Sequence, residues 1–110
     1  MKFTVTDDRR LKVTDLKELV AGNASQLREE VRHSLTEECK GVDIDLSQTS
    51  FVDSSGLGAL IAIQKSLRLH HGNLRLLEPS ASAMQVIELT RLHQFFEIIP
   101  KPKSPGLVGG

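Results

Sequence analysis

The residues best suited to chemistry stand together in one short segment, Asp53-Ser54-Ser55. Two hydroxyls beside a carboxylate could provide a nucleophile or an acid–base group. Asp45, at the end of an earlier alternating segment, could pair with Asp53 for acid–base work. The structural alternative is that Asp45 ends a strand and that the Asp-Ser-Ser segment caps a helix, where these residue types are preferred. For catalysis we favour the structural alternative, although Asp53 could shape a binding surface while it caps.

The motifs of several enzyme classes are absent from the sequence. A nucleophile elbow requires a glycine two residues before the serine, but Val52 and Asp53 occupy those positions. No glycine-rich phosphate loop precedes Lys65-Ser66. The histidines lack metal-ligand spacing with cysteine or a carboxylate pair: His33, His70, His71 and His93. The sequence therefore predicts a protein that is not an enzyme and that binds neither a metal nor a cofactor.

Composition and charge restrict the function further. A chain of 110 residues suits one domain, and its 14 basic residues balance its 14 acidic ones. That balance argues against a nucleic-acid partner, which needs a basic surplus. Cys39 is the only cysteine, which fits a reducing compartment, and no apolar run approaches the ~20 residues needed to cross a bilayer. The N-terminus lacks the apolar core of a signal peptide, so we expect a cytoplasmic monomer or weak dimer without a membrane partner.

A strand and a helix must position the Asp-Ser-Ser segment. Residues 42–46 alternate between apolar and acidic side chains, which predicts a strand, and a polar turn follows at 47–50. A helix is predicted over 57–69, apolar on more than one side. It is therefore either buried on two flanks, or buried on one and used for binding on the other. Gly56 and Gly58 suit positions where the backbone approaches a neighbour or a partner closely.

The flanking segments alternate between strands and helices. A hairpin is predicted over 2–13, whereas 15–22 is ambiguous. A helix is expected to start at the cap Asn23, to carry Cys39 on its apolar stripe and to end at Gly41. The helix over 57–69 is expected to close at Gly72, and a strand follows over 73–77. A third helix capped by Ser80 or Ser82 and a last apolar run over 95–99 complete the order.

This order predicts a single α/β domain with a mixed β-sheet. The opening hairpin is antiparallel, and the β-α-β-α-β-α units that follow give parallel pairing with packed helices. We expect the domain over residues 1–100, followed by a flexible Pro/Gly tail at 101–110.

The central segment resembles a family signature. Asp45-Leu46 followed by Phe51-Val52-Asp53-Ser54-Ser55-Gly56-Leu57-Gly58 is similar to the signature of STAS domains of the anti-sigma factor antagonist type. Residues 86–92, leading into 95–98, are similar to the third helix and last strand of that family. The element order agrees from about Phe3 to Ile99.

The resemblance implies a switch in bacterial partner switching rather than an enzyme. In this family the unphosphorylated protein binds an anti-sigma factor that is also a serine kinase, and thereby frees the sigma factor. The kinase phosphorylates the first serine after the aspartate, and a PP2C-type phosphatase removes the group. By position the acceptor is Ser54. The partner-binding residues implied by the signature are Asp45, Asp53, Ser54, Ser55, Gly56 and Leu57.

The sequence departs from the family pattern in three places. The Gly-x-x-Asp that often precedes the first helix is replaced by residues 17–20, and the glycine that commonly closes the third helix is replaced by Arg91. The Pro/Gly tail stands where relatives often have a C-terminal helix. Two other functions stay open: a STAS docking subunit of another assembly, such as a lipid-transport complex or a signalling scaffold, and a small enzyme using Ser54. The intact acceptor segment favours the phosphorylation-controlled antagonist.

Overall fold

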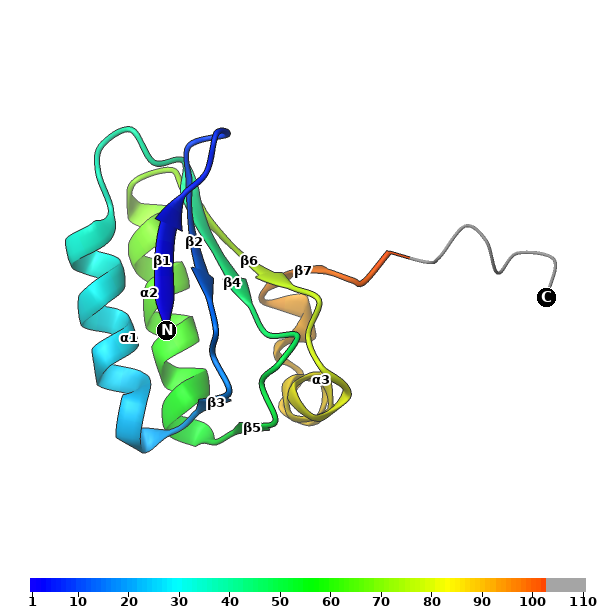
Figure 1. Ribbon diagram of the computed structural model, residues 1–110. Helices are drawn as coiled ribbons and strands as arrows, with labels where there is room; N and C mark the ends of the chain where they lie inside the picture. The colour runs from blue at the N-terminus through cyan, green and yellow to red at the C-terminus, as the bar shows by residue number, and fades with distance from the viewer. Residues whose placement is uncertain (103–110) are drawn as a thin grey trace, which may run out of the picture.

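The computed structural model describes residues 1–102, which alternate between strands and helices along the chain (Figure 1). The predicted tail therefore lies outside the described residues from position 103 onward. The strands are β1 (Lys2–Val5), β2 (Arg10–Thr14), β3 (Glu18–Leu19), β4 (Gly41–Asp45), β5 (Phe51–Val52), β6 (Asn73–Leu77) and β7 (Glu97–Ile99). The helices are α1 (Ala21–Ser34), α2 (Ser54–Leu69) and α3 (Ala81–Leu89), with a 3-10 turn η1 (Leu92–Gln94).

Five strands form one mixed sheet in the order β1-β2-β4-β6-β7. The pairing of β1 with β2 is antiparallel, and the pairings of β2 with β4, β4 with β6 and β6 with β7 are parallel. The predicted fold class, including the opening hairpin, is confirmed. The short strands β3 and β5 pair separately, in parallel, and the sequence prediction did not include them.

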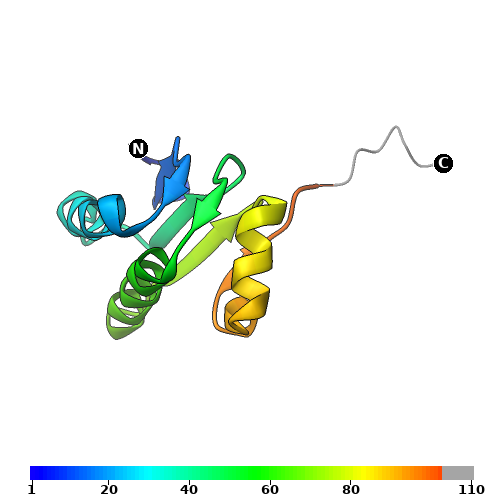
Figure 2. The same cartoon turned by 90° about the horizontal axis from the view of Figure 1, so that it is seen from below.

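The core lies against one face of this sheet. Alternation places aliphatic side chains of β2, β4 and β6 on that face, and α1 and α2 pack side by side nearby (Figures 1 and 2). α3 and the segment after it add Ala83, Ile87 and Phe96 to the same cluster. The strand residues are at most 1% exposed: Leu11, Val13, Val42, Ile44, Leu74 and Leu76.

α1 differs from its predicted bounds at both ends. It begins at Ala21, and Asn23 is not the cap but a residue of the first turn, whose Oδ1 accepts the Val20 N–H at 2.9 Å. The helix ends at Ser34 because the next residue is extended, with φ −72° and ψ 132°. Cys39 therefore lies outside the helix, and Gly41 opens β4 instead of ending α1.

The turn after α2 also differs from the prediction. His71, not Gly72, adopts the left-handed conformation, with φ 63°, and the Gly72 N–H instead donates to the Leu67 carbonyl at 2.8 Å. At the start of α3 the structure selects Ser80 over Ser82, since the Ser80 Oγ accepts the Ala83 N–H at 3.1 Å.

Arg91 closes the third helix in a conformation that favours glycine. Its φ of 60° and ψ of 20° lie in the left-handed region, where a side chain with a Cβ costs about 1–2 kcal/mol. The resemblance implies glycine at this position, so the departure noted in the sequence falls where a glycine would adopt the observed backbone at lower cost.

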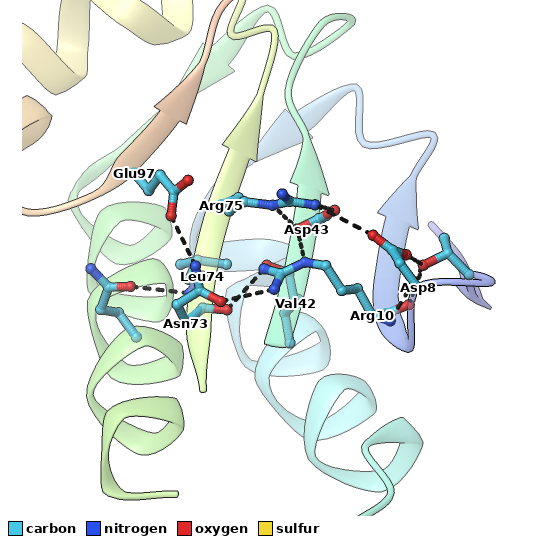
Figure 3. Close-up of polar contacts among 10 residues, drawn as sticks. Asp8, Arg10, Val42, Asp43, Asn73, Leu74, Arg75 and Glu97 are labelled. Carbon is cyan, nitrogen blue, oxygen red and sulfur yellow. Dashed lines mark hydrogen bonds and ion pairs between the residues drawn. The ribbon is translucent and has the colours of Figure 1, made fainter. Parts of the chain in front are cut away.

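A polar network crosses the opposite face of the sheet (Figure 3). Asp43, on the central strand β4, accepts hydrogen bonds from Arg10 Nε at 2.7 Å and from Arg75 Nη2 at 2.6 Å. Arg10 also donates to Asn73 Oδ1 at 2.8 Å, and Asn73 Nδ2 donates to Glu97 Oε1 at 2.8 Å. The network thus joins β2, β4, β6 and β7, which are distant in sequence.

The charge at the centre of this network is buried. Asp43 is 5% exposed and Arg10 7%. Burial alone would raise the pKa of Asp43, but the hydrogen bonds from Arg75 and Arg10 together outweigh it and hold the pKa below its ordinary value. A carboxyl with a lowered folded-state pKa stabilises the fold above its unfolded pKa of about 3.9, and this stabilisation is lost as the pH falls through the folded-state pKa.

Replacing Arg91 by glycine should stabilise the protein. Arg91→Gly removes the Cβ that opposes a positive φ, and we expect a gain of about 1 kcal/mol after the added chain entropy of the unfolded state. Thermal unfolding measures it, as a rise of about 4–8 °C for a domain of this size. Arg91→Ala is the matched control, because it removes the side chain but keeps the Cβ. Equal gains from both variants would assign the effect to the arginine side chain instead.

Removing the Asp43 carboxylate should destabilise the protein strongly. Asp43→Ala leaves the buried Arg10 without a counter-charge, which costs roughly 3–5 kcal/mol. In urea unfolding across pH, wild-type stability should fall in acid, and Asp43→Asn should flatten that fall. Asp8→Asn is the control, since Asp8 is exposed and its carboxylate lies 4.0 Å from Arg75 Nη2, too far for a hydrogen bond. An Asp43→Asn profile as steep as that of wild type would contradict the role given to this carboxyl.

Candidate functional site

Asp53 binds the N-termini of two helices. As the N-cap of α2 it accepts the Gly56 N–H on Oδ1 at 2.9 Å, and its Oδ2 accepts the Ala21 N–H of α1 at 3.0 Å. The hydrogen bonds from Gly56 and then from Ala21 lower the pKa of Asp53, because they stabilise the charged carboxylate. The structural role predicted for Asp53 is therefore present, and it extends to a second helix.

The start of α2 rests directly on β3. The Asp53 N–H donates to the Leu19 carbonyl at 3.1 Å, and Val52 pairs with Leu19. At Gly56 an added Cβ would lie 2.2 Å from the Leu19 carbonyl oxygen, a clash with backbone. The close approach predicted for this glycine is confirmed, whereas a Cβ on Gly58 would meet nothing within 4 Å.

The two serines stand on the surface at the first positions of α2. Ser54 and Ser55 are both exposed, and neither hydroxyl makes a hydrogen bond to another part of residues 1–102. Phe51 on β5 precedes them and is 58% exposed, one of four large apolar side chains that are exposed within residues 1–102. Gly56 and Leu57, by contrast, are buried beneath this surface.

Asp45 has a local task of its own. Its Oδ1 accepts the Ser47 N–H at 2.8 Å, which closes the turn after β4. It lines a polar cavity of about 290 Å³ together with Lys2 and Asp15, and none of the Asp53–Leu57 residues lines that cavity. The structure thus gives the two carboxylates separate backbone partners, which supports the structural alternative over an acid–base pair.

Some residues of this site could not be found from the sequence. Ala21 and Leu19 contribute only backbone groups, which leave no sequence signal. Phe51 belongs to the segment that resembles the family signature, but its apolar residue type does not predict that its side chain is exposed. Within residues 1–102 no three His, Cys, Asp or Glu side chains gather to hold a metal ion. No described helix has the length and apolar character to cross a membrane.

The two glycines of the first turn should respond in opposite ways to alanine. Gly56→Ala forces its Cβ into the Leu19 carbonyl, so β3 and α2 must separate, and we expect a loss of about 2 kcal/mol or more. Gly58→Ala enters open space in a helix and should stabilise by about 0.5–1 kcal/mol. Urea unfolding measures both. Similar effects of the two substitutions would show that α2 does not rest on β3 in this way.

A family model and a curated relative both match this chain and point to the same family. The sequence model of the STAS domain matches residues 5–104. The anti-sigma-B factor antagonist of Listeria monocytogenes is 32% identical over 81 residues, which cover 74% of this chain and 71% of the relative.

Solved structures share the fold. A Thermotoga maritima protein with a provisional assignment as an anti-sigma factor antagonist superposes with a TM-score of 0.81 at 25% identity, covering 91% of this chain and 86% of its own. The anti-sigma factor antagonist SpoIIAA in its unphosphorylated form gives 0.76 at 19% identity, covering 91% and 88%. The Bacillus cell fate determinant SpoIIAA in its phosphorylated form gives 0.65 at 18% identity, covering 91% of both chains. Fold, signature and sequence match agree, and the chain belongs to the STAS domain family, with relatives among the anti-sigma factor antagonists.

Proposed function

We propose that this protein is an anti-sigma factor antagonist whose binding to an anti-sigma factor kinase is controlled by phosphorylation of Ser54. The observation that carries the proposal is the exposed Ser54 hydroxyl, free of hydrogen bonds to other described residues, at the first position of α2. A kinase can reach such a hydroxyl without local unfolding. A PP2C-type phosphatase reversing the reaction, in the cytoplasm, completes the proposed cycle.

The arrangement favours a switch over catalysis. Both oxygens of Asp53 already accept backbone N–H groups, and its lowered pKa makes it a weak base. No other side chain in residues 1–102 hydrogen-bonds to the Ser54 hydroxyl, so no described group activates it as a nucleophile. These features support a regulatory protein that is not an enzyme.

A phosphoryl group at Ser54 meets opposing local forces. It adds about −1.5 to −2 charges at neutral pH. The N-terminus of α2 has no acidic residue in its first turn, and its helix dipole favours the added charge. The neighbouring Asp53 carboxylate repels it. Because these terms oppose one another within the monomer, the fold should change little on phosphorylation.

An interface is far more sensitive to the same charge. The proposed partner surface consists of the exposed Ser54 and Ser55, the half-buried Asp53 and the exposed Phe51, with Gly56 and Leu57 shaping it from below. A partner surface that fits a neutral hydroxyl must desolvate the phosphoryl group. An uncompensated charge in an interface costs several kcal/mol, which is enough to release the partner.

Asp45 remains a proposed partner residue, but its own contacts are with Ser47 and with a polar cavity that residues 53–57 do not line. The docking-subunit alternative, in a lipid-transport complex or a signalling scaffold, rests on the departure at residues 17–20. That segment lies against the site, since the Lys17 carbonyl accepts the Ser50 N–H at 2.9 Å and Leu19 accepts from Asp53. A changed segment at this place would alter which partner fits, while the phosphorylatable segment is intact.

Substitutions at Ser54 should separate stability from binding. Ser54→Asp places a carboxylate in the first turn of α2, so the free energy of unfolding should move by less than about 1 kcal/mol. Binding to the anti-sigma factor should weaken severely, whereas Ser54→Ala should bind and resist inactivation by kinase and ATP. Ser82→Ala, which removes an exposed hydroxyl from the first turn of α3 outside the proposed partner surface, is the control and should keep both binding and inactivation.

Melting temperature and partner affinity are measured on the same samples, and fragment-ion mapping locates the phosphate. If Ser54→Asp binds as tightly as wild type, the docking-subunit function replaces the switch. Phosphate found only on Ser55 would contradict the acceptor assignment.

A further inference from the structure

A groove between α1 and α2 is not used by the proposed switch. It has a volume of about 410 Å³ and lies between the C-terminal halves of the two helices. Its floor is apolar: Val31, Ile63 and Leu67 are buried, and Leu35 and Ala62 are half-buried. This groove is the second apolar side of α2 that the sequence indicated, and it is only partly covered by α1.

The rim of the groove is basic. Arg28 lines it and forms no ion pair within residues 1–102. Arg32 also lines it and contacts Glu29 at 2.8 Å, but both side chains are more than half exposed. Such an exposed pair contributes little, so Arg32 can exchange Glu29 for another acid at small cost. His70, the residue after α2, lines the opposite wall.

The length of the groove matches a helical ligand. Its lining runs along α1 from Arg28 to Leu35, the residue that follows the helix, and along α2 from Ala62 to His70, which likewise follows the helix. At 1.5 Å rise per residue these spans are about 10–12 Å, or two helical turns. A helix that presents apolar side chains at i, i+3, i+4 and i+7 has the same repeat.

We propose that this groove docks an acidic amphipathic helix of a partner protein. The apolar face of that helix would cover Ala62 and Leu35, and its flanking acids would pair with Arg28 and Arg32. Charge complementarity favours an acidic ligand, because two arginines on the rim, Arg28 and Arg32, stand against one acid, Glu29, and Arg28 forms no ion pair among residues 1–102. The groove is concave, so it suits an inserted helix better than a flat membrane surface.

The groove and Ser54 are separate along α2. From Ser54 to Ala62 the helix rises about 12 Å, which exceeds the Debye length of about 8 Å at physiological salt. A charge at Ser54 should therefore leave docking in the groove unchanged. A partner held there would stay attached while the Ser54 surface binds and releases.

The test uses a synthetic helical peptide with leucines at i, i+3, i+4 and i+7 and glutamates beside them, and a matched peptide with lysines in place of the glutamates. The glutamate peptide should bind wild-type protein and shift the NMR amide signals of Leu35, Ala62 and Ser66, but not those of Ser55. The lysine peptide should bind at least about tenfold more weakly. Equal binding of the two peptides, shifts confined to other residues, or no binding would overturn the proposal.

Matched variants locate the effect. Arg28→Glu should weaken glutamate-peptide binding about tenfold, whereas Lys65→Glu, the same charge change on an exposed residue outside the lining, should change it by less than about twofold. Ala62→Phe should fill the floor and block binding. Equal effects of Arg28→Glu and Lys65→Glu would mean that peptide binding follows the net charge of the protein and not the groove, which would overturn the proposal.

Two further measurements test whether the groove instead binds a second copy of this chain or a lipid. Dimerisation in sedimentation that is abolished by Ala62→Phe would assign the groove to a second copy of this chain, and Arg28-dependent binding to anionic vesicles would assign it to lipid. Either result overturns the proposal. Ser54→Asp should bind the glutamate peptide as wild type does. Peptide binding therefore tests the groove, and partner release by Ser54→Asp tests the switch, so either proposal can fail without the other.

Discussion

The carboxylate of Asp53 organises one end of the molecule, because it satisfies backbone N–H groups of two helices at once. The first N–H groups of any helix lack partners within that helix. Here one oxygen accepts from Gly56 in α2 and the other from Ala21 in α1. α1 has no side-chain cap of its own at Val20. This shared cap therefore links the N-termini of α1 and α2 directly, next to the place where α2 contacts β3.

The opposite face of the sheet depends on a second carboxylate in another way. Asp43 is buried and draws Arg10 and Arg75 across the central strands, so its charge is compensated by two cations. Asp53 has no cationic partner among the described residues and is stabilised by backbone dipoles alone. The contrast bears on the proposed switch, because Asp53 brings no cation with it that a phosphoryl group on Ser54 could share.

Features with a strong local pattern could be predicted from the sequence. β6 was predicted at its observed bounds, and the central strand and the hairpin followed from alternation. β3 and β5 were missed because two-residue strands show no period. The start of α1 was misplaced because its cap comes from Asp53, far along the chain, so no local residue marks it. The charge network was missed for the same reason, since its members stand on strands that only the fold brings together.

The site was predictable to a similar degree. The Asp-Ser-Ser segment, its place at the start of a helix and the close approach at Gly56 followed from residue types and the family signature. The burial of Leu57 and the exposure of Phe51 did not, because both are apolar residues and only tertiary packing separates them.

The shared cap also has a consequence for synthesis of the chain. A helix of 14 residues such as α1 is marginal alone in water. The Ala21 N–H has its native acceptor on residue 53, so the first turn of α1 cannot reach its final arrangement on the ribosome until that residue has emerged. The strand β4 leaves the ribosome before then and can pair with β2. During synthesis β2 and β4 are therefore available for pairing before the shared cap of α1 can form, and residue 53 supplies the last acceptor that the first turn of α1 needs.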